Sequence, residues 1–316
     1  MHESLEECSS SYHLFIFAFD DLSWSILSHL KLKNVTVVPL SEFENEELKE
    51  VKKNRSKAEY CWTSTPSVLW HLIKIKGLPE CTYVDADLIF WSDPRLLTDE
   101  MISWGGNVLI TEHRFSKLAR LHGEKKAGRF CVQFMTFMNE ESSLKVLERW
   151  KNQCIEWCYA RYEDGKFGDQ KYLDEWPDIY DNVHILQNHG GGVAPWNVTN
   201  YSFSRDGNII TGRPKGSGSD FMVVFYHYQY VKIVADDRFD IGWYIIPEDV
   251  KRHFYTVYAV NIAKKEQFLR DLFPEYSTGY FNYKGKGIKE RVKSLLKEQL
   301  GYNVLKIKTN GLFNRS

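Results

Sequence analysis

Short apolar runs and amphipathic segments alternate along the first part of the chain. Residues 13–19 and 35–40 are apolar runs of strand length. Between them, residues 21–30 have helical spacing and follow Asp20 or Asp21 as a cap. This alternation predicts a strand, a helix and a second strand. Strands that alternate with helices are typical of a mixed, mostly parallel sheet covered by helices, which is the expected fold class.

The middle of the chain continues the alternation. Ser41 caps a charged helix, and Pro66 marks the first turn of a helix that leads into residues 68–75. Apolar runs at residues 107–110 and 130–137 predict two more strands. Residues 141–159 have the i, i+3, i+4 spacing of a long amphipathic helix.

The last part of the chain is less regular. Residues 183–186 and 222–228 resemble strands, and residues 197–219 between them are rich in Gly, Ser and Asn, which predicts a long loop. Beyond Pro247 the pattern is mostly helical. We therefore expect a catalytic domain at residues 1–245 and a helical, basic extension at 246–316. Because MHESLEEC has the pattern of a helix end, an initial strand is expected to be missing before it.

Composition excludes several functional classes. The net charge of −1 does not provide the basic field of a nucleic-acid-binding protein. The six cysteines form no CxxC pair and follow no secretory signal, which fits a reducing cytoplasm, and no apolar run is long enough to cross a bilayer. The 15% of aromatic residues would suit a sugar site, although such rings also fill protein cores.

Residues 284–316 are strongly cationic. They contain nine basic side chains against Glu290 and Glu298: Lys284, Lys286, Lys289, Arg291, Lys293, Lys297, Lys306, Lys308 and Arg315. One interpretation is a solvated helix face. The other is weak attachment to the inner face of the membrane, where a lipid-linked acceptor would be found.

The segment YVDADLIF places Asp85 and Asp87 directly after an apolar strand. On an extended backbone, residues two apart point to the same side, so both carboxylates can share a hard cation such as Mn²⁺ or Mg²⁺. Two close like charges also need a cation or a proton between them. A short DxD of this kind can equally be a turn at a strand end.

Phosphatases of the haloacid-dehalogenase type are a rival, because they also place DxD after an apolar strand. Here Gly168-Asp169, with Asp174 five residues later, resembles their distal acidic motif. However, the residue two past Asp87 is Ile89 rather than Thr or Val, and RYEDGKF before Gly168 is no apolar strand.

A more specific resemblance rests on several ordered blocks over roughly residues 55–245. They read RSKAEYCWTSTPSVLW, YVDADLIFWSDP, ITEHRFS, FCVQFMTF, EDGKFGDQKYLDEWP and NHGGGVAPWN. In these blocks the chain resembles bacterial nucleotide-diphospho-sugar transferases of surface-polysaccharide pathways, distant relatives of glycosyltransferase family 8. The resemblance implies a GT-A-like α/β fold, a nucleoside-diphosphate-sugar donor, a saccharide or lipid-linked saccharide acceptor, and a divalent metal.

The resemblance also assigns residues. Asp85 and Asp87 match the DxD, and Asp169-Gln170 match an Asp-Gln pair near the transferred sugar. His189 in HGGGVAPW and His227 in FYHYQY compete as the third metal ligand, and His227 is favoured because the first motif lacks a residue and has Ala194 in place of lysine. Likeness to family 8 implies a retaining reaction, with Asp169 as an inverting base as the alternative.

Five further residues are candidate contacts for donor or acceptor. Their chemistry suits phosphates, hydroxyls or a sugar ring, and they are Arg55, Lys57, Arg114, Gln133 and Trp196. Each could equally be a solubilising or packing residue. The functional hypotheses are therefore a metal-dependent glycosyltransferase, a phosphatase, or an inactive sugar-nucleotide-binding protein.

Overall fold

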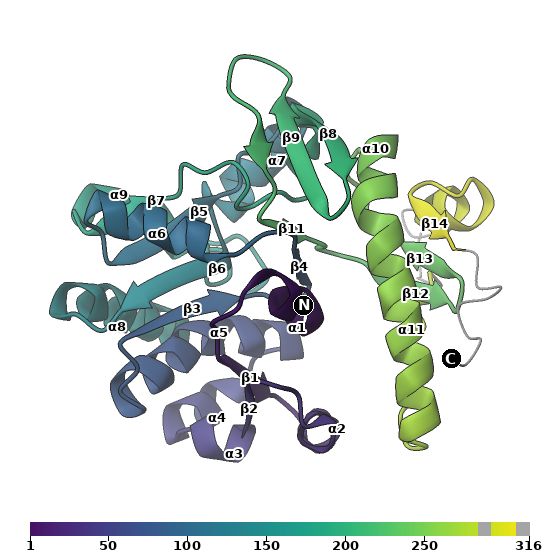
Figure 1. Cartoon of the computed structure of the whole chain (residues 1–316). Helices are drawn as coiled ribbons and strands as arrows, with labels where there is room; N and C mark the ends of the chain where they lie inside the picture. Colours follow the sequence, from purple (N-terminus) through teal and green to yellow (C-terminus); the bar gives the residue numbers. More distant parts are fainter. Residues whose placement is uncertain (284–291, 308–316) are drawn as a thin grey trace.

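A four-stranded sheet lies at the centre of the protein (Figure 1). The structure is a computed structural model that describes residues 1–283 and 292–307. Along the sheet the order is β3 (Glu80–Val84), β6 (Phe130–Met138), β5 (Val108–Glu112) and β7 (Val183–Ile185). β6 is antiparallel to both β3 and β5, and only β5 and β7 are parallel. The chain is mixed α/β, but the prediction of a mostly parallel central sheet is wrong.

The connection between β5 and β6 explains this difference. Two parallel neighbouring strands require a crossover connection, which brings the chain back to the end of the sheet at which the first strand began. Here α7 (Lys117–Ala127) links the two strands, and Glu112 at the end of β5 is paired with Phe130 at the start of β6. The chain therefore re-enters the sheet at the same strand ends at which it left, and β6 runs antiparallel to β5.

Both faces of the sheet are covered. Val108 and Ile110 pack with α5 (Lys57–Trp70) and α8 (Glu141–Glu156), whereas Leu109 between them packs with α6 (Arg95–Trp104) on the other side. β4 (Leu88–Phe90), β11 (Phe225–His227) and α1 (His2–Cys8) complete that second layer. Nearly every residue of β6 is buried, which accounts for its continuous apolar sequence.

The N-terminal elements follow the predicted pattern closely. They are β1 (Leu14–Ala18), α2 (Asp21–Leu30), β2 (Val35–Pro39), α3 (Leu40–Phe43) and α4 (Glu46–Lys52). β1 and β2 are parallel, and the Asp20 side chain caps α2 by accepting from Ser23 N.

The helix expected to begin at Pro66 begins earlier. Ser56 and Glu59 form a capping box that starts α5 at Lys57, and Pro66 lies inside the helix. Reciprocal capping satisfies two backbone donors at that end, so it sets the start of the helix more strongly than the proline does. α5 continues into the π-helical turn η1 (His71–Ile75).

The expected loop at residues 197–219 is largely a β-hairpin. It contains β8 (Tyr201–Asp206) and β9 (Ile209–Pro214), joined by a turn in which Gly207 has a φ of 57°, and β10 (Phe221–Met222) pairs with β9. Tyr201 and Phe203 are buried while the serines between and after them are exposed. That two-residue alternation, rather than the Gly/Ser content, decides the structure.

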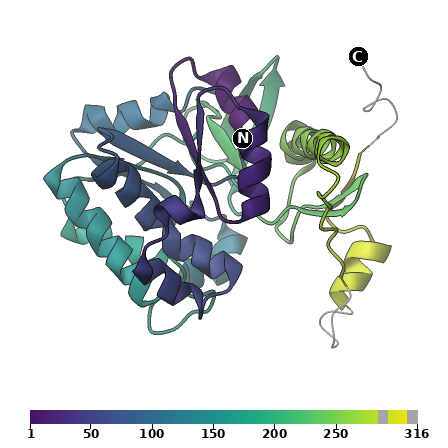
Figure 2. The same ribbon diagram turned by 90° about the horizontal axis from the view of Figure 1, so that it is seen from below.

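The C-terminal region combines helix and strand. It consists of α10 (Glu248–Val250), η4 (Lys251–Tyr255), α11 (Thr256–Leu272), η5 (Leu295–Gln299) and a small antiparallel sheet of β12 (Lys232–Ala235), β13 (Arg238–Asp240) and β14 (Val304–Lys306). α11 stands beside the main body, with this small sheet on its far side (Figures 1 and 2). The extension is therefore not purely helical, because residues 304–306 join strands that precede residue 245.

Three short elements complete the fold: η2 (Lys171–Glu175), α9 (Trp176–Ile179) and η3 (Val198–Asn200). Much of the basic C-terminal stretch, at residues 284–291 and 308–316, lies outside the described residues. Within residues 1–283 and 292–307, no helix has both the length and the apolar character needed to span a bilayer.

Candidate metal centre

Asp85 and Asp87 lie in the turn between β3 and β4. The backbone N–H of Asp85 donates to Gln133 O at 3.1 Å, and the carbonyl of Asp87 accepts from Tyr228 N at 2.9 Å. The turn is thus attached to β6 on one side and to the residue after β11 on the other. Tyr83 additionally donates its hydroxyl to Asp85 Oδ1 at 2.8 Å.

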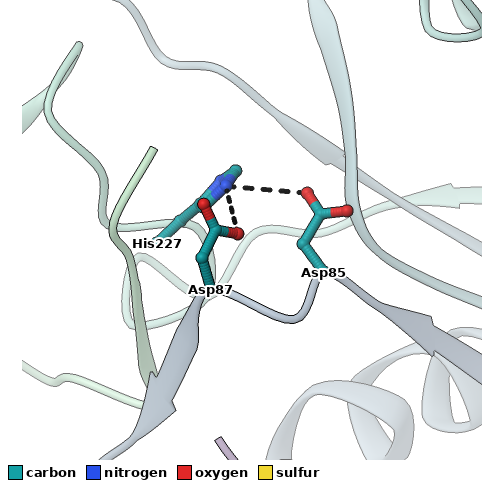
Figure 3. Close-up of side chains that lie close together, drawn as sticks. All are labelled: Asp85, Asp87 and His227. Atoms are coloured by element: carbon teal, nitrogen blue, oxygen red, sulfur yellow. Dashed lines mark ion pairs between the residues drawn. The ribbon is translucent and has the colours of Figure 1, made fainter. Parts of the chain in front are cut away.

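His227 joins these carboxylates because of the pairing of two short strands. β11 runs antiparallel to β4, and this register sets His227 opposite Leu88, the residue that follows Asp87. The imidazole Nε2 lies 3.1 Å from Asp87 Oδ1 and 3.6 Å from Asp85 Oδ2 (Figure 3). The structure therefore brings His227, and not His189, to the DxD segment.

The three side chains have the geometry of a metal-binding group. One ligand atom from each of them lies within 4.8 Å of the others. Two atoms bound to one cation at about 2.0–2.2 Å lie roughly 3–4 Å apart, which matches the His227 distances. Two carboxylates and one imidazole are therefore positioned so that a single divalent cation could contact all of them.

Charge in this group is balanced by His227. Burial raises the pKa of Asp85, and the neighbouring Asp87 carboxylate adds to that effect. Burial also acts to raise the pKa of Asp87, but the hydrogen bond and charge of His227 outweigh it and leave that pKa lowered. Although burial disfavours the imidazolium, the two carboxylates raise the pKa of His227 well above its usual value. A proton on His227 thus occupies the role that a cation would fill.

Gln133 determines which imidazole nitrogen faces the carboxylates. Its Oε1 lies 2.8 Å from His227 Nδ1, and an amide oxygen can only accept, so Nδ1 carries a hydrogen. In the neutral ring, Nε2 is then the nitrogen with a free lone pair, and it points at Asp85 and Asp87. Gln133 is fully buried and also contacts Thr111 Oγ1 at 3.5 Å.

Asp85, Asp87 and His227, the candidate metal-binding group, line a large cavity of about 880 Å³. Aromatic rings form much of its wall, among them Trp62, Tyr83, Phe167, Trp196 and Trp243. This volume lies within the range of pockets that take small organic ligands.

Asp169 and Gln170 line the same cavity. Burial, together with the charge of Asp85, raises the pKa of Asp169 to about 8, so its carboxyl carries a proton at neutral pH. Gln170 donates from Nε2 to Ala127 O at 2.9 Å, which connects it to the end of α7. Asp169 can therefore act as a hydrogen-bond donor to a ligand in the cavity.

Two buried cavity residues have polar atoms without a partner. Neither His113 Nδ1 nor Trp196 Nε1 has a hydrogen bond within the described part of the chain, and both side chains are almost fully buried. Burial lowers the pKa of His113 to about 3, so its imidazole is neutral. The sequence did not single out His113; the only signal was its position after a buried strand in the ITEHRF block. Buried polar atoms of this kind are candidate ligand contacts.

Four other predicted site residues lie elsewhere. The guanidinium carbon of Arg55 lies 3.8 Å from the centre of the Tyr159 ring, and Lys57 is the first residue of α5. Neither residue lines the cavity. Arg114, with a φ of 49°, donates its guanidinium to the carbonyls of residues 186, 188 and 191, so it holds that loop. His189 packs against Phe221 and beside Tyr201, in a separate, smaller pocket that Arg114 also lines.

The distal acidic residue of the phosphatase hypothesis is also placed elsewhere. Asp174 accepts from Arg129 N at 2.8 Å and from Lys171 Nζ at 2.6 Å. It does not belong to the group formed by Asp85, Asp87 and His227, and it does not line their cavity. The arrangement does not favour a phosphatase.

Fold and site together define a mixed α/β protein with a candidate Asp-Asp-His metal centre at a large cavity. No family model matches the chain. Among curated proteins it is 29% identical to the uncharacterized protein YfnD of Bacillus subtilis (strain 168) over 286 residues, which cover 89% of each chain. It is 30% identical to the uncharacterized protein YfnF of the same organism over 244 residues, which cover 74% of this chain and 77% of YfnF. The chain belongs to the same family as YfnF.

A crystal structure of mouse xyloside xylosyltransferase 1 in its apo form is a distant structural match. It has 14% sequence identity and a TM-score of 0.41, and the match covers 72% of this chain and 89% of that one. A score at this level does not assign a fold.

Proposed function

We propose that the chain is a divalent-metal-dependent glycosyltransferase of the GT-A kind, which moves a sugar from a nucleoside-diphosphate sugar to a saccharide or glycolipid hydroxyl. The observation that carries this proposal is the convergence of Asp85, Asp87 and His227 in the wall of a cavity of about 880 Å³. The ordered sequence blocks that resemble nucleotide-diphospho-sugar transferases support it, since several of those blocks line this cavity.

Asp85, Asp87 and His227 would hold the cation, and Mn²⁺ or Mg²⁺ fits two carboxylate oxygens with one imidazole. When bound, such a cation offsets the charge of a diphosphate. Gln133 keeps the ligating nitrogen of His227 directed at the carboxylates.

Other cavity residues suit a sugar. The protonated carboxyl of Asp169 and the free polar atoms of His113 and Trp196 can form hydrogen bonds with hydroxyls of a bound sugar. Aromatic walls such as Trp62 and Trp243 offer flat apolar faces to sugar rings. We further propose that the reaction retains the anomeric configuration, in line with the likeness to family 8.

The test begins with the wild-type protein, incubated with Mn²⁺ and a panel of nucleotide sugars, with release of the nucleoside diphosphate as the readout. We expect at least one donor to be turned over in a metal-dependent way. Asp87→Asn keeps the size of the side chain but loses its charge, so we expect release to fall to the level seen without protein.

Asp220→Asn is the matched control, because Asp220 is an exposed carboxylate paired with Arg213 on the hairpin and is not part of the cavity. That variant should keep full activity.

Unchanged metal-dependent release by a folded Asp87→Asn variant would overturn the proposal. Release of inorganic phosphate from phosphate esters would instead support a phosphatase. Donor binding by calorimetry without any turnover would indicate an inactive sugar-nucleotide-binding protein.

A further inference from the structure

α7, which borders the cavity, packs on the protein through its smallest residues. Ala119, Gly123 and Ala127 are spaced by four, so they share one helical face. Ala119 and Ala127 pack against a buried cluster that includes Phe115 and Trp196. A Cβ added to Gly123 would lie 2.8 Å from the ring of Phe115, so the helix approaches the body as closely as it can. No residue of α7 whose burial the structure describes is fully buried.

The opposite face of α7 carries its largest apolar side chains. Leu118 is 58% exposed and Leu121 is 71% exposed. With Lys125 they follow the i, i+3, i+7 spacing of one helix face, which points away from the three small residues. A helix that serves only the core of its own protein would bury leucines in preference to alanines and glycine. This face therefore has the composition of a contact surface.

The same region is cationic. Between residues 117 and 129 five basic side chains stand against Glu124 alone: Lys117, Arg120, Lys125, Lys126 and Arg129. Arg120 is paired with Glu124 and Arg129 with Glu112. Lys117 and Lys125, both exposed, have no ion-pair partner within residues 1–283 and 292–307. The two exposed leucines thus lie beside lysines whose positive charge would complement anionic lipid headgroups.

α7 also forms part of the mouth of the cavity. Leu118, Ala119, Gly123, Lys126 and Ala127 line it, together with Ile245, which is 55% exposed. The exposed apolar side chains Leu118 and Ile245 therefore continue from the cavity wall to the outer surface of the protein.

We propose that the outer face of α7, formed by Lys117, Leu118, Leu121 and Lys125, is a contact surface for an anionic lipid bilayer. Its positive charge complements acidic headgroups, and its two leucines can enter the acyl boundary. The next step rests on the proposed transferase function. A bilayer bound to this surface would lie beside the mouth of the cavity, so the acceptor class is a saccharide anchored in lipid. It assigns membrane contact to α7 rather than to the basic C-terminal stretch.

The test is co-sedimentation of the full chain with vesicles, without nucleotide or metal, so the result does not depend on catalysis. One set contains phosphatidylcholine alone, and in the other about a third of the lipid is phosphatidylglycerol. We expect binding to the second set only, weakened by added salt because the attraction is screened. Leu121→Gln should lower the partition coefficient roughly tenfold through the lost apolar transfer. Lys117→Gln/Lys125→Gln should lower it by a similar factor.

Leu300→Gln is the matched control, since Leu300 is 69% exposed and belongs to the basic C-terminal region. It should bind vesicles like the wild type. Equal binding to neutral and anionic vesicles, wild-type binding by Leu121→Gln, or loss of binding in Leu300→Gln would overturn the proposal. The proposal would also be overturned if sedimentation velocity showed that the wild type is a dimer and that the Leu121→Gln variant is a monomer, because the leucine face would then be a dimer interface. Because Leu121 does not line the cavity that contains Asp85, Asp87 and His227, donor turnover in solution should be unchanged in that variant.

Discussion

At the scale of single residues, the candidate metal centre includes a contact from a side chain that is not among the three candidate ligands. Gln133 Oε1 accepts from His227 Nδ1, and this bond sets both the tautomer and the orientation of the ring. The sequence had suggested Gln133 as a contact for donor or acceptor. In the structure Gln133 lines the cavity, and its amide oxygen accepts from His227. We infer from this contact that Gln133 also positions the ring.

This role predicts the effect of Gln133→Met. The substitution removes the acceptor but keeps an unbranched side chain of similar length, so the ring of His227 is no longer held. We expect Mn²⁺ affinity, measured by titration calorimetry, to fall roughly 10–100-fold. Gln133→Glu retains an acceptor oxygen and should recover much of that loss. Thr111→Val, which changes a neighbour of Gln133 and does not touch His227, should leave Mn²⁺ affinity near wild type. Unchanged affinity in Gln133→Met would contradict the role.

Asp169 predicts a pH dependence of stability. Its pKa is raised to about 8 in the folded protein, whereas an unfolded chain has an Asp pKa near 3.9. Between these values the folded state holds a proton that the unfolded state has released, so the free energy of unfolding falls as pH rises. For this one group the slope reaches at most about 1.4 kcal/mol per pH unit.

Asp169→Asn removes that contribution. Urea denaturation of both proteins in chelator, between about pH 5 and pH 7, should show a stability difference that shifts in favour of the variant as pH rises. His227, whose pKa is also raised, affects both proteins alike and cancels in the comparison. Parallel pH profiles for the two proteins would show that Asp169 is already ionised at neutral pH.

At the scale of elements, the C-terminal segment 292–307 holds a loop of the cavity. Lys297 Nζ donates to Asp240 Oδ1 and Gly242 O, and lies 4.2 Å from the centre of the Trp243 ring. Asn303 donates to the carbonyls of Gly242 and Tyr244. Trp243 and Tyr244 line the cavity, so an element near the end of the chain positions part of its wall.

Lys297→Met tests this arrangement. Lys297 and Asp240 are both fully buried, so losing one charge leaves the other uncompensated and should destabilise the protein by roughly 3–5 kcal/mol. The double variant Lys297→Met/Asp240→Leu should recover much of that stability, because neither charge remains. Lys306→Met, which removes an exposed lysine 3.6 Å from Asp237, should change stability little. Thermal denaturation and Trp fluorescence provide the measurements. An equal, small effect of both lysine substitutions would contradict the assigned role of the buried pair.

At the scale of the whole molecule, the direction of the strands was the main feature that the sequence did not reveal. Apolar runs indicated where β3, β5, β6 and β7 lie, because a buried strand needs a continuous or alternating apolar pattern whatever its direction. Strand direction depends on the path of the connecting segment. The segment that contains α7 joins the end of β5 to the adjacent start of β6, where Glu112 pairs with Phe130, so β6 runs antiparallel to β5. Similarly, the Gly/Ser content of residues 197–219 hid a hairpin whose pairing depends on contacts between its two strands.

The sequence alone determined the local structure of much of the chain and the chemistry of the DxD pair. Helix α2 with its Asp20 cap, strand β6 and the carboxylates Asp85 and Asp87 follow from neighbouring residues, because capping, periodicity and two-residue spacing act within a few positions. The sequence favoured His227 over His189 as the third ligand, but only the tertiary structure placed it beside both carboxylates. Only the tertiary structure also decided that Gln133 contacts His227 and that α7 turns its leucines outward. Those facts depend on which segments pack together. Packing brings together residues that are far apart in the sequence, and the sequence pattern around each residue does not indicate its distant neighbours.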